Sequence, residues 1–292
     1  MSILKYIGYL TAEKRFSNHT IKAYLSDLYQ FEAYLKNDYE ITNILKADQT
    51  TVKSWSVYLK SSGLENRSIN RKLTTLRSFY HFCLKNEMIS KTPVDRIKSL
   101  KIRKRPPTFI PLSDMIKADI KLTQKSYINI RDNLIIELLY QTGIRLSELT
   151  NLAETDIDFH SNALKVNGKR NKQRIIPFDS GLRTLIIDYI RARNEEIKVK
   201  TNSLFVTNKG NSAYPELINR IVHGKLKEIT TIHKTSPHVL RHTFATHLLN
   251  QGADLMAIKE LLGHTSLSAT QVYTHSSIEQ LKKIHQQAHP KG

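Results

Sequence analysis

Two arginines, two histidines and one tyrosine are the residues whose types and spacing could do chemistry in this chain. His238, Arg241, His264 and Tyr273 stand near the C-terminus, and Arg145 lies far upstream. Two guanidiniums can grip the oxygens of a phosphodiester, histidines can move protons, and a tyrosine can attack phosphorus. The set needs no metal ion. In a basic protein it indicates the cutting or rejoining of nucleic acid.

The charge balance points to the same partner. The 292 residues include 45 Lys and Arg against 26 Asp and Glu, which gives a net charge of +19. Residues 1–105 hold 20 basic and 9 acidic residues, and residues 106–292 hold 25 and 17. Such an excess attracts polyanions. Because both parts of the chain are basic, we expect both to contact the same double-stranded DNA, as a clamp does.

Composition also argues against several other classes of protein and site. No apolar run approaches the ~20 residues that span a bilayer, so we expect no membrane partner. Cys83 is the only cysteine, which leaves no internal disulfide and no cysteine metal cluster; its apolar surroundings predict a buried, inert thiol. The segment Met1–Lys5 has neither an apolar signal core nor a cleavage site, and we expect a cytoplasmic protein.

The first hundred residues carry helical periodicity. Apolar residues at three- and four-residue steps predict helices over 20–35, with Ser17 as N-cap, over 48–61, and from Asn66 or Ser68 to about Leu84. The polar side of the third helix is basic. It is either a solvated face or a surface that contacts phosphate, and its four charged residues are Arg67, Arg71, Lys72 and Arg77.

A basic segment that contains prolines follows this helical part. Prolines disfavour helix, so Lys98–Pro107 is predicted to be an extended linker able to lie along a DNA backbone. Its candidate DNA contacts are Arg103, Lys104 and Arg105. We therefore predict a helical domain over residues 1–98, a linker over 99–108 and a second domain over 109–292.

The second domain is predicted to be mixed. Short apolar runs predict strands over 157–159, 163–166 and 174–177, with a turn at 167–173. Helices are predicted over 132–141, 181–194, 215–229, 237–250, 255–262 and 277–287. Gly143, Gly252 and Gly263 are predicted helix stops, and Ser236 before Pro237 is a predicted helix start.

These elements would position the reactive residues. Arg145 lies two residues after the predicted stop at Gly143, so its guanidinium can project from a fixed corner. His238 and Arg241 share a helix face at a helix N-terminus, which favours anions. Taken singly, each residue has a plainer interpretation as a surface charge, an ion-pair partner or a structural histidine. A metal site on the histidine-rich segment is weakly supported, since the segment lacks the HExxH pattern.

Taken together, the residues resemble a known family. Residues 142–152 and 236–275 are similar to the two signature boxes of the tyrosine recombinases, also called the phage integrase family, and the hairpin at 163–172 resembles the one that carries the lysine of that family. The resemblance spans essentially the whole chain. It implies a mainly α fold with a small antiparallel β-sheet: an N-terminal helical SAM-like core-binding domain and a C-terminal catalytic domain.

The resemblance also implies a role for each residue. Tyr273 attacks the scissile phosphate and forms a 3′-phosphotyrosine bond. Arg145 and Arg241 clamp the non-bridging oxygens, and His264 donates a hydrogen bond that supports the clamp. His238 accepts the tyrosine proton or orients the group that does so.

The leaving group needs an acid, and the resemblance implies that Lys169 protonates the departing 5′ oxygen. Arg170 and Lys172 share its turn, so Lys172 is an alternative. The covalent phosphotyrosine keeps the energy of the broken phosphodiester, so no ATP, metal ion or other cofactor is implied. The chain shows no GxxxxGK[ST] phosphate loop.

Within the family, the compact layout resembles the Xer-type recombinases. This implies homo- or hetero-tetramers on two duplexes, a sister recombinase, a DNA translocase as activator, and chromosome-dimer resolution at cell division. The helix predicted at 277–287 would pack into a neighbour or onto its own domain.

Four other functions stay open. They are the integrase or transposase of a mobile element, a type IB topoisomerase, a catalytically idle DNA-binding regulator and a metal-dependent nuclease.

Overall fold

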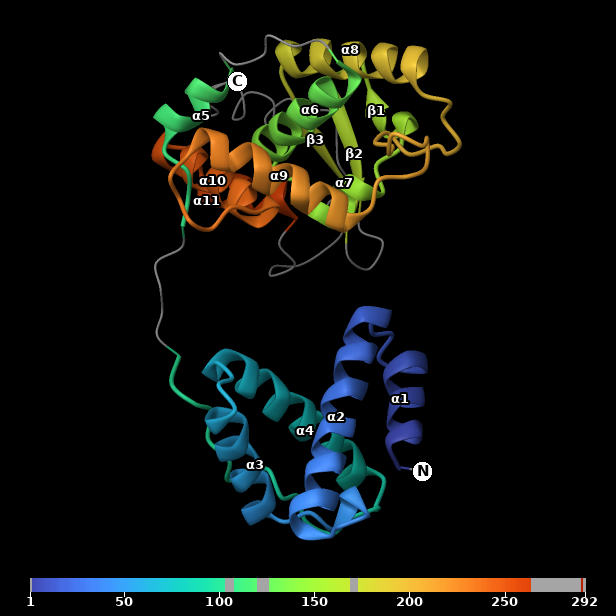
Figure 1. Cartoon of the computed structure of the whole chain (residues 1–292), viewed down its shortest axis with the longest axis vertical. Coiled ribbons are helices and arrows are strands. Elements are labelled where there is room, and N and C mark those ends of the chain that lie inside the picture. The colour runs from blue at the N-terminus through green and yellow to red at the C-terminus, as the bar shows by residue number, and fades with distance from the viewer. Residues whose placement is uncertain (1, 103–107, 120–125, 169–172, 264–289, 291–292) are drawn as a thin grey trace. The chain divides into compact units, whose positions relative to one another are not determined.

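The chain folds into two compact units, Met1–Arg105 and Pro106–Gly292, in a computed structural model (Figure 1). The structure describes residues 2–102, 108–119, 126–168, 173–263 and 290. Helices dominate both units, and the strands form one small antiparallel sheet in the second. The prediction of a mainly α fold with a small antiparallel sheet is confirmed.

The first unit is helical throughout its described elements. These are α1 (Ser2–Ala12), α2 (Asn18–Tyr39), the 3-10 turn η1 (Ile44–Lys46), α3 (Gln49–Ser61) and α4 (Asn66–Lys85). Ser17 caps α2 by accepting a hydrogen bond from the backbone N–H of Thr20, as predicted. Asp48 caps α3 in the same way through Thr51, with a reciprocal bond that completes a capping box.

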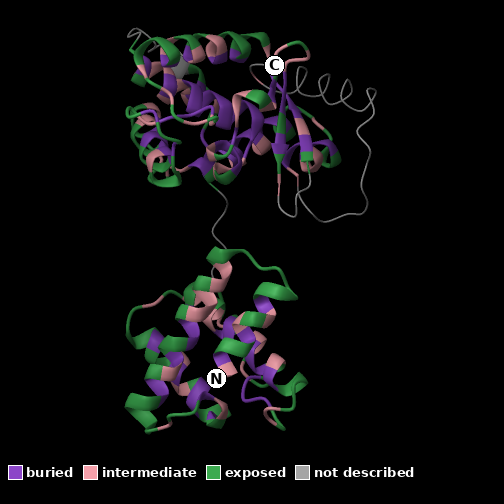
Figure 2. Cartoon of the chain, turned by 90° about the vertical axis from the view of Figure 1, so that its right-hand side faces the viewer, coloured by how far each residue is buried: buried purple, intermediate pink, exposed green. Residues whose placement is uncertain are grey.

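Aromatic side chains fill the core of this unit. Trp55 of α3 packs against Phe31 of α2, with ring centroids 4.9 Å apart, and Tyr6 of α1 meets Phe79 of α4 edge to face at 5.4 Å. Figure 2 shows buried, intermediate and exposed residues following one another along the helices, as is typical of helices with one buried face. Cys83 is fully buried, as predicted, and burial raises the pKa of its thiol to about 11.

A buried carboxylate joins α2 to the basic side of α4. Asp27, 1% exposed, accepts hydrogen bonds from Arg71 Nη2 at 2.9 Å, Lys72 Nζ at 2.9 Å and Thr75 Oγ1 at 2.9 Å. Lys72 also donates to Gln30. A buried charge must be paired to be tolerated, and this network supplies the pairing.

The second unit is built around α6 (Tyr127–Thr142). Its other helices are α5 (Leu112–Asp119), α7 (Leu146–Thr150), α8 (Ser180–Glu196), α9 (Pro215–Ile229), α10 (Pro237–Asn250) and α11 (Leu255–Leu262), with a 3-10 turn η2 (Glu154–Asp156). The strands β1 (Ile157–Asp158), β2 (Ala163–Asn167) and β3 (Gln173–Pro177) pair in the order β1-β2-β3, both pairs antiparallel. β2 and β3 form a hairpin whose last pair in register is Asn167 with Gln173.

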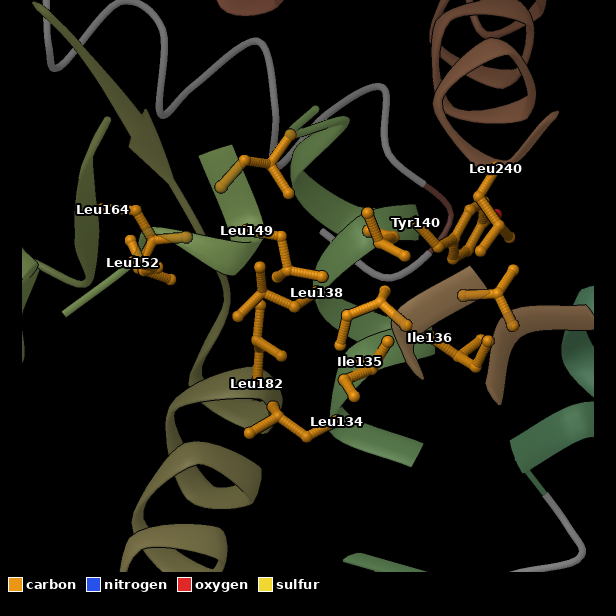
Figure 3. Close-up of a cluster of buried hydrophobic side chains, with 14 of the residues drawn as sticks. Leu134, Ile135, Ile136, Leu138, Tyr140, Leu149, Leu152, Leu164, Leu182 and Leu240 are labelled. Atoms are coloured by element: carbon orange, nitrogen blue, oxygen red, sulfur yellow. The ribbon is translucent and has the colours of Figure 1, made fainter. Parts of the chain in front are cut away.

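Helix α6 forms the centre of this core. Leu134, Ile135, Leu138 and Leu139 are fully buried, and Leu182 of α8 and Leu240 of α10 pack in the same cluster (Figure 3). Because α6 is apolar on nearly every side, it is covered all round rather than on one face. The helices that carry the reactive residues therefore rest on a fixed support.

Local sequence signals located most elements but not all. Helix α5 is not among the predicted elements, and Phe159, which the prediction includes in the first strand, lies outside β1. The helix predicted over 277–287 falls outside the described residues. Among the described residues, no helix combines the length and apolar character that a bilayer crossing requires.

We expect Asp27→Ala to destabilise the protein by about 3–5 kcal/mol, because removing the carboxylate leaves the mostly buried ammonium of Lys72 without its anion. Urea unfolding of the full chain measures the loss. The control is Asp38→Ala, which removes an exposed carboxylate from the same helix. Equal stability of the two variants would contradict the structural role of Asp27.

Candidate active site

The tight turn between α6 and α7 fixes the position of Arg145. Gly143 ends α6 in the left-handed region at φ 57°, and a Cβ built there would lie 2.5 Å from Cδ1 of Phe244. Both the backbone conformation and the close approach of Phe244 therefore require glycine. Arg145 follows as the N-cap residue of α7, with its side chain 27% exposed. The guanidinium is thus held at a fixed corner of the unit, as predicted from the glycine.

Helix α10 supplies the second arginine. Ser236 caps it by accepting a bond from the N–H of Val239, and Pro237 occupies the first turn, as predicted. Arg241 is 7% exposed. Its Nη1 donates to the carbonyl oxygen of Gly143, and its Nη2 donates to that of Leu262 at 2.6 Å. The same glycine that ends α6 therefore also anchors Arg241.

The C-terminal end of α11 gathers three arginines. Arg174 Nε donates to the carbonyl oxygen of Leu261 at 2.8 Å, Arg241 Nη2 donates to that of Leu262, and Arg145 Nη2 donates to that of Gly263 at 2.8 Å. A helix end leaves its last carbonyls without intrahelical partners and carries negative potential. Guanidiniums from β3, α10 and the N-cap of α7 satisfy three consecutive carbonyls here.

One carboxylate lies among these cations. Glu148 of α7 accepts two bonds from Arg174, each 2.8 Å, one from Arg145 Nη1 at 2.7 Å and one from the backbone N–H of Arg145 at 2.7 Å. Burial raises the pKa of Glu148, but the hydrogen bonds and charge of Arg174, with the bonds from Arg145, outweigh it and lower the pKa to about 2. Glu148 is therefore ionised at neutral pH.

The cluster has an excess of positive charge. Among the described residues, Arg145, Arg174 and Arg241 face one carboxylate, that of Glu148. Burial lowers the pKa of Arg241 to about 9, and the charges of Arg145 and Arg174 add to this effect. The guanidinium stays protonated at neutral pH, but its protonated form is less stable here than it would be in water. A bound anion would relieve this repulsion, so the site is suited to a phosphate.

His238 lies one helical turn before Arg241 and is exposed at the start of α10. Burial, together with the neighbouring His238, lowers the pKa of His242. Lys169, His264 and Tyr273 fall outside the described residues. Gly263, the residue before His264, caps α11 at φ 63°, where a Cβ would lie 3.1 Å from Cδ of Arg174. Of the six predicted catalytic residues, the structure thus brings Arg145 and Arg241 together and places His238 on the helix of Arg241.

The predicted DNA contacts on α4 have mixed surroundings. Arg67 is exposed, whereas Arg71 and Lys72 bind Asp27, and Arg77 Nη2 donates to the carbonyl oxygen of Ile97 at 2.6 Å. The Lys72 side chain is only 11% exposed, so it is not part of a fully solvated face. Arg103, Lys104 and Arg105 fall outside the described residues. That these residues contact DNA stays a prediction.

Glu148 and Arg174 were not recognised as site residues from the sequence. Two signals were available. Glu148 stands three residues after Arg145 at a helix start, the spacing of a capping box. Arg174 stands two residues before the apolar Ile176 in β3, so the two side chains lie on the same, buried face of the strand. A buried arginine requires an anionic or carbonyl partner.

Two basic units, with an arginine cluster suited to phosphate in the second, are typical of a protein that acts on nucleic acid. The profile of the phage integrase family matches residues 112–280, and that of the phage integrase N-terminal SAM-like domain matches residues 3–87. The tyrosine recombinase XerC of Staphylococcus aureus strain USA300 is 36% identical over 287 residues, which cover 98% of this chain and 96% of that protein. XerC of strain JH9 is 35% identical over the same coverage.

Solved structures share the fold. XerH recombinase bound to palindromic difH substrate superposes with a TM-score of 0.72 at 23% identity, covering 90% of this chain and 78% of XerH. The Tn1549 transposon integrase in complex with circular intermediate DNA superposes with a TM-score of 0.71 at 20% identity, covering 96% of this chain and 99% of that integrase chain. The chain belongs to the phage integrase family of tyrosine recombinases. It is an enzyme that breaks and rejoins DNA strands, and DNA is its partner.

The depressed pKa of Glu148 makes a prediction about acid stability. A carboxylate whose pKa falls from 4.5 to about 2 on folding stabilises the native state above pH 4.5, and the stabilisation disappears as pH falls toward 2. We expect Glu148→Gln to be less stable than wild type at pH 7 by on the order of 3 kcal/mol. The gap should shrink between pH 4.5 and 2. Urea unfolding at several pH values measures it, and a gap independent of pH would contradict the account.

Proposed function

We propose that this chain is a Xer-type site-specific recombinase that resolves chromosome dimers. Tyr273 attacks the scissile phosphate and forms a 3′-phosphotyrosine bond, while the bond from phosphorus to the 5′ oxygen breaks. His238 takes the tyrosine proton or orients the group that does so, and Lys169 gives a proton to the departing 5′ oxygen. A tyrosine of pKa ~10 needs such a base to react at neutral pH. Attack by a new 5′ hydroxyl reverses the chemistry and joins the strand.

The observation that carries this proposal is the preformed arginine cluster. Phosphoryl transfer depends mainly on positioning and on neutralisation of charge at the phosphate. In our proposal Arg145 and Arg241 grip the two non-bridging oxygens, and His264, next to Gly263, adds a further donor. Both guanidiniums are held by carbonyl oxygens before any DNA arrives. The grip therefore requires little reorganisation when the phosphate binds.

The chromosomal role rests on the extent of likeness to XerC. The 36% identity runs over 98% of this chain and leaves little of either protein unmatched. By that likeness, we propose a homo- or hetero-tetramer on two duplexes, with a sister recombinase, a DNA translocase as activator, and the cytoplasm as its place of action. We also propose that the two domains are residues 1–98 and 109–292. We propose that the basic segment between them, which includes Arg103–Arg105, contacts the DNA backbone, and that Arg67 does so as well.

Covalent capture tests the function and finds the target site. The protein is incubated with fragmented genomic DNA of the organism that encodes it, the reaction is quenched with detergent, and DNA attached to protein is sequenced. We expect one short site to be enriched, with the cut position at the attached 3′ end. Strand transfer between two duplexes of that site then separates a recombinase from a topoisomerase. Cut ends without attached protein would overturn the proposal.

We expect Tyr273→Phe to abolish the detergent-resistant adduct on a nicked duplex of the captured site, because the nucleophilic oxygen is gone. DNA binding, measured by gel shift, should stay at the wild-type level, since the ring remains. Loss of binding in step with cleavage would count against Tyr273 as the nucleophile.

Arg241→Ala should slow adduct formation by at least about 100-fold, by analogy with removal of a single oxyanion donor. The matched control is Arg191→Ala, which removes an exposed arginine of α8 and should leave the rate unchanged. A rate for Arg241→Ala close to that of the control would show that the phosphate grip is misassigned.

A further inference from the structure

Arg174 is not one of the predicted catalytic residues, yet it contacts Glu148 and the end of α11, which hold the arginines of the site. It is 4% exposed on β3. Both Nη atoms bind the carboxylate of Glu148 at 2.8 Å, and Nε binds the carbonyl oxygen of Leu261 at 2.8 Å. This fork geometry satisfies the guanidinium on three sides and fixes its orientation. One side chain thus joins β3, α7 and α11.

The charges explain what Arg174 contributes. Glu148 is buried and also binds Arg145 Nη1 at 2.7 Å. If Arg145 were its only cationic partner, the carboxylate would neutralise the charge that is meant for the scissile phosphate. The bidentate pair with Arg174 neutralises Glu148 instead. Arg145 then keeps its place beside the carboxylate while its charge remains available to the phosphate.

We propose that Arg174 is a positioning residue for the phosphate grip: it acts as the counter-ion of Glu148 and holds the end of α11, so that Arg145 and Arg241 present their charge to the scissile phosphate. This inference rests on the proposed roles of Arg145 and Arg241. Arg174 contacts neither the phosphate nor the nucleophile in this role, and it acts through Glu148 and the carbonyl oxygen of Leu261.

The same side chain also anchors the hairpin. Arg174 pairs in register with Val166, directly beside the Asn167–Gln173 pair that is the last described pair before the turn. Lys169, the proposed general acid, lies between those two residues in the sequence. The bonds of Arg174 to α7 and α11 therefore connect the base of the hairpin to the elements that hold the arginines.

A double-variant experiment separates this role from simple packing. Arg174→Met, Glu148→Gln and the combination of both are compared with wild type in single-turnover adduct formation on a nicked duplex of the captured site. Rates are measured from pH 8 down to about 4.5, the ordinary pKa of a glutamate, and are expressed relative to wild type at the same pH. The matched control is Arg193→Met, because Arg193 of α8 is equally buried and binds Glu154 and the carbonyl oxygen of Leu204.

We expect Arg174→Met to be slower than wild type by about 10- to 100-fold, by analogy with outer-shell residues that orient metal ligands, because the unopposed carboxylate of Glu148 now competes with the phosphate for Arg145. Adding Glu148→Gln removes that charge and should recover roughly 10-fold. Arg193→Met should keep the wild-type rate.

The pH profile supplies a second readout. Among the described residues, the charged groups that face Glu148 are Arg145 at the start of α7, Arg174 on β3 and Arg241 on α10. Loss of Arg174 removes the partner that most strongly lowers the pKa of Glu148. In Arg174→Met the deficit should therefore shrink as pH falls and Glu148 takes up a proton. The double variant should show no such change.

The proposal would be overturned if the double variant lost as much rate as the two single variants together, and if the rate deficit of Arg174→Met did not depend on pH. Arg174 would then be a packing residue. If Arg174→Met fails to fold by thermal unfolding, Arg174→Lys and Arg174→Gln replace it. The lysine keeps the charge and should be at least roughly 10-fold faster than the glutamine; equal rates would overturn the proposal. If wild type itself forms no adduct, the proposed function fails, which is a different outcome.

Discussion

The structure of the candidate site depends on the C-terminal end of one short helix. Carbonyl groups at a helix end must find partners, and at the end of α11 three of them, in consecutive residues, bind arginines from three different elements. Because a guanidinium has a fixed planar geometry, each bond restrains the direction of the whole group. The turn after α6, the helix α10 and the strand β3 are thereby brought to one point.

This arrangement places several positive charges close together and neutralises only part of them. In the described part of the chain, Arg145 and Arg174 bind the carboxylate of Glu148, and Arg241 lies near enough to feel its charge, in surroundings that are mostly buried. Burial lowers the pKa of Arg241, and repulsion from Arg145 and Arg174 lowers it further, so a bound anion would stabilise the cluster. In the proposed function, a phosphodiester supplies the missing negative charge. We propose that the net charge of +19 attracts DNA to the protein and that the cluster then binds one phosphate.

Much of this could be predicted from the sequence, because the signals are local. Ser17, Gly143, Ser236 and Gly263 mark helix ends by side-chain capping or by backbone conformation, and the structure uses each of them in that way. The family motifs located Arg145 and Arg241. The roles of Lys169, His264 and Tyr273 stay predictions, since these residues fall outside the described part of the chain.

The remaining features depend on contacts between distant segments. Asp27 looks like any helical carboxylate until α4 brings Arg71, Lys72 and Thr75 to it from more than forty residues away. Arg174 is 26 residues from Glu148 and 87 from Leu261, so no local pattern connects the three. Periodicity could show that Arg174 is buried, but only the fold shows which carboxylate neutralises it.

The proposed chemistry requires that the arginine cluster is already in place for the scissile phosphate before DNA binds. The most direct measurement is a structure of the Tyr273→Phe protein bound to a duplex of its captured site. We expect the scissile phosphate within hydrogen-bonding distance of both Arg145 and Arg241, while the carbonyl oxygens of Leu262 and Gly263 still accept from them. A phosphate bound elsewhere, or arginines released from these carbonyls to reach it, would contradict the account.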